Sequence, residues 1–236
     1  MPRQLALDLT TPPALGRADF LVTPASAPAL ALLDRPGDWP GGRLLLVGPE
    51  GAGKSHIAAF WAAEHGARRV AASALGPELA DALLPPGAAL VVEDAHRAGG
   101  AAGAEQALFH LWNLVPSRGA TLLLTARTPP RDWGLALPDL RSRMDAMAQA
   151  RLGPPDDALL AAVLVKLFAD RQIAIPPAVV AALAARMERD LGLARRLVAA
   201  IDQGALAAGR PVTRRLALDT LARLNPPARS PDETGA

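Results

Sequence analysis

The fold of this chain is decided by eight consecutive residues, Gly48-Pro49-Glu50-Gly51-Ala52-Gly53-Lys54-Ser55. They match the pattern Gly-x-x-x-x-Gly-Lys-Ser, with the apolar run Arg43–Val47 before them and a helical pattern over Lys54–Glu64 after them. In this strand–loop–helix order, backbone N–H groups surround an anionic phosphate, Lys54 neutralises it, and Ser55 offers a hydroxyl to Mg²⁺. The sequence therefore predicts that these residues bind ADP or ATP together with Mg²⁺.

The regions around this loop predict an α/β fold. Further apolar runs at 69–72, 88–93, 121–126 and 148–152 are separated by helical patterns such as 104–114. Strands that alternate with helices form a parallel sheet with helices on both faces. We therefore expect a five-stranded P-loop core.

A second, all-α region follows Gly153-Pro154-Pro155. Helical apolar spacing recurs there over 156–171, 177–187, 192–203 and 213–224, which predicts a small four-helix lid. We expect four parts: an extended arm over 1–17, a nucleotide-binding domain over 18–153, the lid over 154–224 and a disordered tail over 225–236.

Two strand ends carry candidate site residues. The run at 88–93 ends in Glu93 and is followed by Asp94. Glu93 would reach Mg²⁺ directly or through water, and Asp94 would orient or activate the attacking water. Aspartate usually comes first, so glutamate at 93 is a departure, and a solvated strand end is the alternative. Thr125 ends another run and could face the γ-phosphate, although threonine is also ordinary in strands.

Two arginines, Arg141 and Arg143, follow Asp139 shortly before the last expected strand. An arginine presented to a neighbouring protomer's γ-phosphate stabilises the charge of the transition state for hydrolysis. Two ordinary surface arginines are the alternative interpretation.

Composition excludes several classes of protein. The chain has 236 residues, half of them hydrophobic, a net charge of +2 and no cysteine. Without cysteine there is no disulfide framework or thiolate site, and the four histidines lack ligand spacing, so we expect no metal beyond Mg²⁺. No apolar run approaches the length of about 20 residues that a bilayer requires. We expect a cytoplasmic protein that does not interact with membranes.

The N-terminal residues Gln4-Leu5-Ala6-Leu7-Asp8-Leu9 alternate leucine with other residues ahead of Pro12 and Pro13. An edge strand of a core is one interpretation. The other is an extended arm that places Leu5, Leu7 and Leu9 in an apolar groove of a partner, with Gln4 fixing the register.

Taken together, these elements resemble the AAA+ domain of the bacterial replication initiator DnaA and its relatives, over residues 20–224. The resemblance is carried by Phe20-Leu21-Val22, by 48–56, by 91–96, by Glu105-Gln106-Ala107-Leu108-Phe109-His110-Leu111-Trp112-Asn113, by 125–130 and by 140–144. It implies that Phe20 and His56 lie at the nucleotide and that Thr125 belongs to the site.

Two features are similar to the Hda-type members of this family, which are regulatory inactivators of DnaA. No C-terminal helix-turn-helix domain follows the lid, and residues 4–9 are similar to peptides that dock on the replication sliding clamp, the β subunit of DNA polymerase III. The resemblance implies an ADP-bound protein on a DNA-loaded clamp, which contacts DNA only through the clamp. Arg143 would then act in trans as an arginine finger on ATP bound to DnaA.

One position departs from that pattern, because Gly192 falls where such proteins often carry a second sensor arginine. Arg189, Arg195 or Arg196 would have to substitute for it. We therefore expect weak or no ATPase activity of the chain's own. The alternative function is a DnaA-like ATPase that acts as a helicase loader or as a DNA-binding initiator.

Overall fold

The computed structural model describes residues 15–209 and 211–225. The expected clamp-binding residues 4–9 and nearly all of the expected tail lie outside these residues. Within the part of the chain that is described, no helix is both long and apolar enough to cross a membrane.

Five parallel strands form one sheet in the order β2-β3-β4-β1-β5. Their bounds are β1 Arg43–Val47, β2 Arg68–Ala71, β3 Ala89–Glu93, β4 Thr121–Ala126 and β5 Gln149–Arg151. The predicted α/β fold is confirmed, and each strand lies within two residues of its predicted position.

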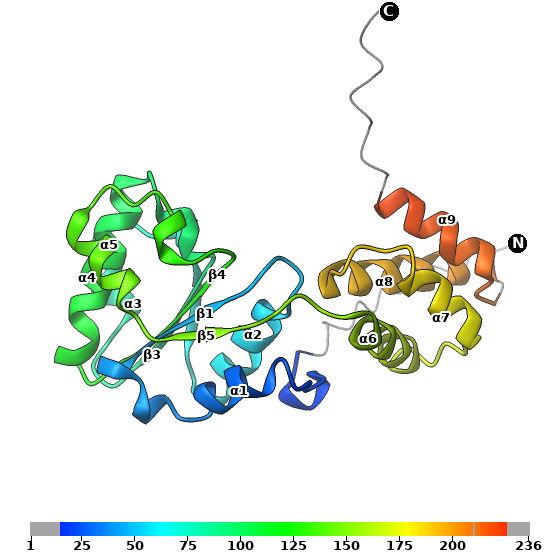
Figure 1. Ribbon diagram of the computed structural model, residues 1–236, viewed down its shortest axis with the longest axis horizontal. Coiled ribbons are helices and arrows are strands. Elements are labelled where there is room, and N and C mark those ends of the chain that lie inside the picture. Colours follow the sequence, from blue (N-terminus) through cyan, green and yellow to red (C-terminus); the bar gives the residue numbers. More distant parts are fainter. Residues whose placement is uncertain (1–14, 210, 226–236) are drawn as a thin grey trace, which may run out of the picture.

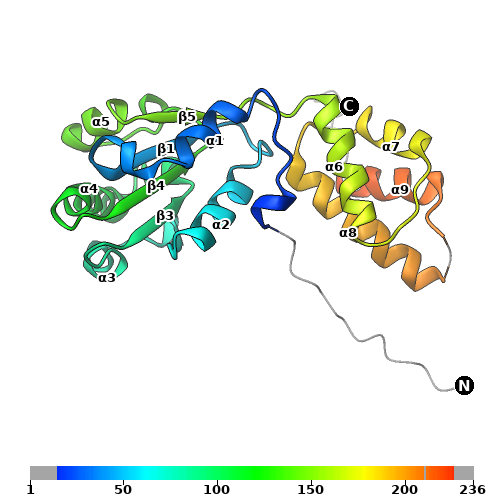
Figure 2. The ribbon, with the colours of Figure 1, turned by 90° about the horizontal axis from the view of Figure 1, so that it is seen from below.

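Helices cover both faces of this sheet (Figures 1 and 2). The bounds are α1 Ala27–Leu33, α2 Lys54–Glu64, α3 Ala80–Leu83, α4 Ala102–Ser117 and α5 Pro138–Asp145. Helices α1 and α2 pack on one face, while α3, α4 and α5 pack on the other.

The three central strands, β1, β3 and β4, are mainly apolar because both of their faces are buried. Leu44 and Leu46 of β1 belong to the core beneath α1 and α2, whereas Leu45 belongs to the core beneath α4. Successive side chains of a strand point to opposite faces, so a strand covered on both sides has to be apolar at every position.

The lid consists of α6 Asp157–Ala169, α7 Pro177–Ala184, α8 Leu191–Ala208 and α9 Arg214–Leu224 around its own apolar core. It lies beside the sheet domain, at the end away from α4 and α5 (Figure 1). Short 3-10 turns occupy 17–19, 36–38, 40–42, 72–74, 77–79, 95–98 and 130–132.

Candidate nucleotide-binding site

The phosphate-binding loop joins β1 to α2 and depends on its glycines. Gly51 and Gly53 have φ values of 72° and 95°, a backbone region that other residues rarely adopt. A Cβ at Gly48 would lie 2.7 Å from the carbonyl oxygen of Leu152, beside β5. The glycines therefore allow both the bend of the loop and its close approach to the neighbouring strand.

Lys54 opens α2 and is almost fully buried, with 7% of its surface exposed. Its Nζ donates hydrogen bonds of 2.6 Å to the carbonyl oxygens of Gly48 and Pro49. Burial is the main reason why the pKa of Lys54 is lowered, although Asp94 opposes this effect. A bound phosphate would supply the anion that this buried ammonium group lacks.

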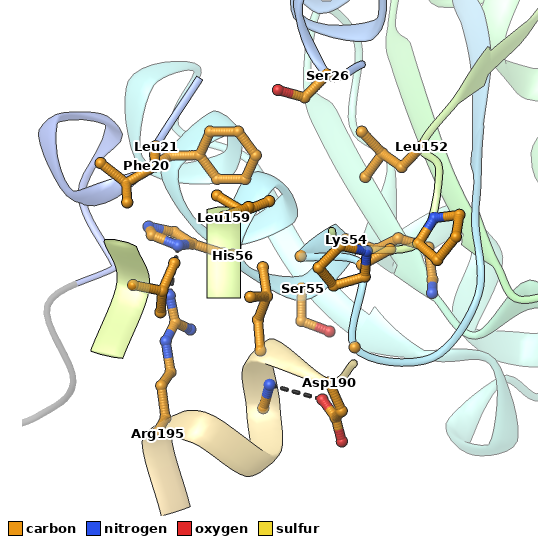
Figure 3. Close-up of a pocket in the computed structure, with 18 of the residues that line it drawn as sticks. Phe20, Leu21, Ser26, Lys54, Ser55, His56, Leu152, Leu159, Asp190 and Arg195 are labelled. Carbon is orange, nitrogen blue, oxygen red and sulfur yellow. Dashed lines mark hydrogen bonds between the residues drawn. The ribbon is translucent and has the colours of Figure 1, made fainter. Parts of the chain in front are cut away.

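The pocket lies between the loop and the lid (Figure 3). Its apolar wall includes Phe20, Leu21, Pro155, Leu159, Val163 and Leu167. Its polar wall includes Glu50, Lys54, Ser55, Asp94, Arg127, Asp190, Arg195 and Arg196. An apolar wall beside a charged wall that carries Lys54 fits a purine base joined to phosphates.

Of the two acids at the end of β3, Asp94 lines the pocket and Glu93 does not. The Glu93 carboxylate instead accepts hydrogen bonds from Arg69 on β2, from Nε at 3.0 Å and from Nη2 at 2.6 Å. The prediction that Glu93 reaches Mg²⁺ is therefore not what this structure shows, because its side chain turns along the sheet toward the neighbouring strand. Ser55 and Asp94 both line the pocket, where they could contact Mg²⁺ and the attacking water of a bound nucleotide.

Thr125 does not line the pocket, but it supports Asp94, which does. It is 2% exposed, and its Oγ1 accepts a hydrogen bond of 3.1 Å from the N–H of Asp94. Asp94 has a left-handed φ of 54°, so this hydrogen bond helps hold it in a conformation that aspartate seldom adopts. Arg127, two residues after Thr125, lines the pocket and forms an ion pair with Glu50.

Phe20 and His56 lie next to each other in the pocket wall, with ring centroids 5.4 Å apart in an edge-on arrangement (Figure 3). His56 is buried; its Nε2 lies 3.0 Å from the carbonyl oxygen of Gly16, and its Nδ1 faces Arg195 of the lid. Burial lowers the pKa of His56, and Arg195 lowers it further. His56 thus connects the loop helix to the lid as a neutral side chain.

Of the three arginines considered as substitutes for a sensor at position 192, two line the pocket. Arg195 and Arg196 on α8 reach it, whereas Arg189 pairs with Asp157 on the lid surface. Two further pocket-lining residues, Arg127 and Asp190, were not among the predicted site residues. Arg127 follows the end of β4 closely, which is a usable signal, but Asp190 is indistinguishable in sequence from any helix-capping aspartate.

Arg143 does not line the pocket of its own chain. It lies on α5, where its Nη1 donates to Oδ1 of Asn113 at 2.5 Å and its guanidinium stacks over Phe109 at 4.8 Å. Both partners are on α4, one helical turn apart. Helices α4 and α5 lie at the end of the sheet domain away from the lid (Figure 1).

A buried carboxylate supports the loop that leads into α5. Glu105 of α4 is 1% exposed and accepts hydrogen bonds from the N–H groups of Gly100, Ala136 and Leu137 at 2.9 to 3.1 Å. Burial opposes its ionisation, but these three donors outweigh burial and lower the pKa of Glu105.

Glu105→Ala is expected to lower the free energy of unfolding by about 3 kcal/mol, because three N–H groups lose their acceptor. A carboxylate with a lowered pKa in the folded state stabilises it above the ordinary pKa of 4.5 and loses this effect as the pH falls below that value. Denaturant unfolding should therefore show that the variant and the normal protein differ less in free energy of unfolding at about pH 4 than at about pH 7. Gln106→Ala, an exposed neighbour, is the control; a loss that does not depend on pH would contradict the charge argument.

No protein-family model matches the sequence. Domain III of the replication initiator DnaA from Thermotoga maritima superposes with a TM-score of 0.75 at 19% identity, covering 91% of this chain and 98% of that one. The chain has the AAA+ fold.

Two further AAA+ structures are similar at lower scores. DnaA bound to AMPPCP and single-stranded DNA gives a TM-score of 0.66 at 13% identity, with 84% of this chain and 68% of that one covered. The RuvB Holliday junction branch migration motor of Thermotoga maritima gives 0.63 at 22% identity, with 85% and 67% covered. At these identities the likeness extends to the AAA+ fold, and the function has to be argued from the site.

Proposed function

We propose that this AAA+ protein binds ADP and regulates the replication initiator DnaA by stimulating hydrolysis of DnaA-bound ATP through Arg143. The observation that carries this proposal is the position of Arg143. Arg143 does not line the chain's own pocket, and its guanidinium is held against α4 by Phe109 and Asn113. An arginine placed in this way can reach a nucleotide only on another molecule.

The pocket of the chain itself supports a binding role. Lys54, Ser55 and Asp94 bring together a cation, a hydroxyl and a carboxylate of the kinds that phosphates and Mg²⁺ require. Position 192 is glycine, so the lid offers no arginine at the point where α8 begins. A tightly held nucleotide with slow turnover fits this arrangement.

The test is release of phosphate from DnaA-bound ATP in the presence of DNA-loaded clamp, with and without this protein in its ADP form. Acceleration would support the proposal. Equal rates with and without the protein would overturn it, provided that binding of ADP to the protein is verified in the same preparation.

Docking on the sliding clamp is the second part of the proposal, and it rests on residues 4–9. Gln4→Ala combined with Leu5→Ala is expected to weaken clamp affinity by about a hundredfold, because the arm loses a hydrogen-bonding anchor and an apolar one. Titration of clamp by surface plasmon resonance measures the change. Thr10→Ala with Thr11→Ala, just beyond the motif, is the matched control, and unchanged affinity in the first variant would show that the arm is not the docking element.

A second candidate function is an independent ATPase, such as a helicase loader. The observation that favours it is Asp94, which lines the pocket together with Lys54 and Ser55 and so could activate water for attack on the chain's own nucleotide. Turnover of ATP at about 1 per second or faster, without DnaA, would favour this candidate.

A further inference from the structure

The N-terminus of lid helix α8 rests directly on the phosphate-binding loop. The N–H of Leu191 donates a hydrogen bond of 3.1 Å to the carbonyl oxygen of Gly51. A Cβ added at Gly51 would collide with the carboxylate of Asp190, and it would lie 2.5 Å from the Cα of Asp190. Asp190 is therefore in close contact with the tip of the loop, as Figure 3 shows beside Ser55.

The Asp190 carboxylate is fixed in place. It caps α8, accepting a hydrogen bond of 2.6 Å from the N–H of Gly192, and its other oxygen lies 3.5 Å from Arg196. Only 18% of the side chain is exposed. A Cβ at Gly192 would lie 3.0 Å from Oδ1 of Asp190, the oxygen that caps α8, and 3.4 Å from Arg196. Glycine at position 192 therefore leaves room for this arrangement.

This carboxylate has two electrostatic consequences for the pocket. Its negative charge lies in the wall that also carries Lys54, where an anion is to bind. It also engages Arg196, a cation that would otherwise be free to attract phosphate. Both effects act against additional negative charge, and each grows with the charge of the bound nucleotide.

We propose that Asp190 is a specificity-determining residue that favours the diphosphate over the triphosphate. A γ-phosphate would add negative charge to the nucleotide in a pocket whose wall carries the Asp190 carboxylate, whereas a diphosphate would bring less charge into the same pocket. This inference deepens the nucleotide-binding part of the proposed function and does not depend on the action on DnaA.

The test compares dissociation constants for Mg²⁺-ADP and Mg²⁺-AMPPCP, measured by calorimetry on the full chain and on Asp190→Asn. Asparagine keeps an oxygen to cap α8 and removes only the charge. Affinity for AMPPCP is expected to rise about tenfold, while affinity for ADP changes by less than about threefold. Added salt should reduce this gain in preference, because the charges lie close to solvent.

Asp157→Asn is the matched control, since Asp157 is an exposed lid carboxylate that pairs with Arg189 outside the pocket. Asp190→Ser, which also keeps a capping oxygen, repeats the test should the asparagine variant fold poorly, as judged by thermal unfolding. An unchanged ratio of the two dissociation constants in both Asp190 variants would overturn the proposal, as would equal weakening of both nucleotides.

Failure of this inference is separable from failure of the proposed function. If the normal protein binds ADP but the Asp190 variants keep its ratio of ADP and AMPPCP affinities, only the proposed role of Asp190 is wrong. If the normal protein binds neither nucleotide, the nucleotide-binding part of the proposed function is wrong as well, and the role of Asp190 falls with it. Stimulation of DnaA is decided by the phosphate-release experiment alone.

Discussion

Phosphate release from DnaA-bound ATP, stimulated by this protein on DNA-loaded clamp, is expected to slow by about a thousandfold or more when Arg143 is replaced by alanine. A guanidinium that reaches the γ-phosphate stabilises charge that develops only in the transition state. Its removal should therefore depress the maximal stimulated rate, while the concentration of protein needed for half-maximal stimulation changes little. Single-turnover hydrolysis of radiolabelled ATP loaded on DnaA measures both quantities.

Arg141→Ala is the matched control, because Arg141 lies on the same helix, is exposed, and differs from Arg143 in lacking the contacts to Phe109 and Asn113. Arg143→Lys should recover only a small part of the rate, since an ammonium group keeps the charge but not the planar fork. ADP affinity should be the same in all three variants, because neither arginine lines the pocket. Full stimulation by Arg143→Ala would show that hydrolysis is promoted by another group.

Lys54→Ala is expected to reduce ADP affinity by about a hundredfold or more, which corresponds to about 3 kcal/mol. Lys54 is 7% exposed, so its interaction with a phosphate is screened little by water. The variant also leaves the carbonyl oxygens of Gly48 and Pro49 without their donor, which loosens the loop itself. Titration with ADP in the presence of Mg²⁺ measures the loss.

Arg69→Ala is the control for Lys54→Ala, because it also removes a positive charge from the sheet domain. Arg69 pairs with Glu93 and does not line the pocket. Its ADP affinity should match that of the normal protein. Retained affinity in Lys54→Ala would contradict the assignment of the site. If the normal protein turns over ATP and Lys54→Ala abolishes this turnover, the result would favour the alternative function, a helicase loader.

How far a short stretch of sequence predicts a structure depends on whether the signal is local. The glycines and Lys54 of the loop, the apolar strand before it and the helix after it all lie within about 20 consecutive residues, and their spacing leaves few alternatives. The alternation of apolar strands and helices likewise predicted the parallel sheet from local sequence. Parallel strands buried on both faces have to be apolar throughout, and they were found within two residues of their predicted positions.

The local sequence did not show which of the two acids, Glu93 or Asp94, faces the pocket. Both acids stand at the end of β3, and only the presence of Arg69 on the adjacent strand turns Glu93 away from the pocket. Thr125 likewise supports Asp94 through a hydrogen bond from one strand end to the next. Such pairings depend on the order of strands in the sheet, which the sequence of a single strand does not encode.

The sequence by itself determined the α/β fold and the strand–loop–helix context of the phosphate-binding loop, because these follow from propensities and spacings of neighbouring residues. Only the tertiary structure decided that Asp94 faces the nucleotide pocket, that Asp190 rests on Gly51 and that Arg143 is held away from the pocket of its own chain. Each of these depends on the packing of segments far apart in the chain, where side-chain direction is set by the neighbours that folding brings together.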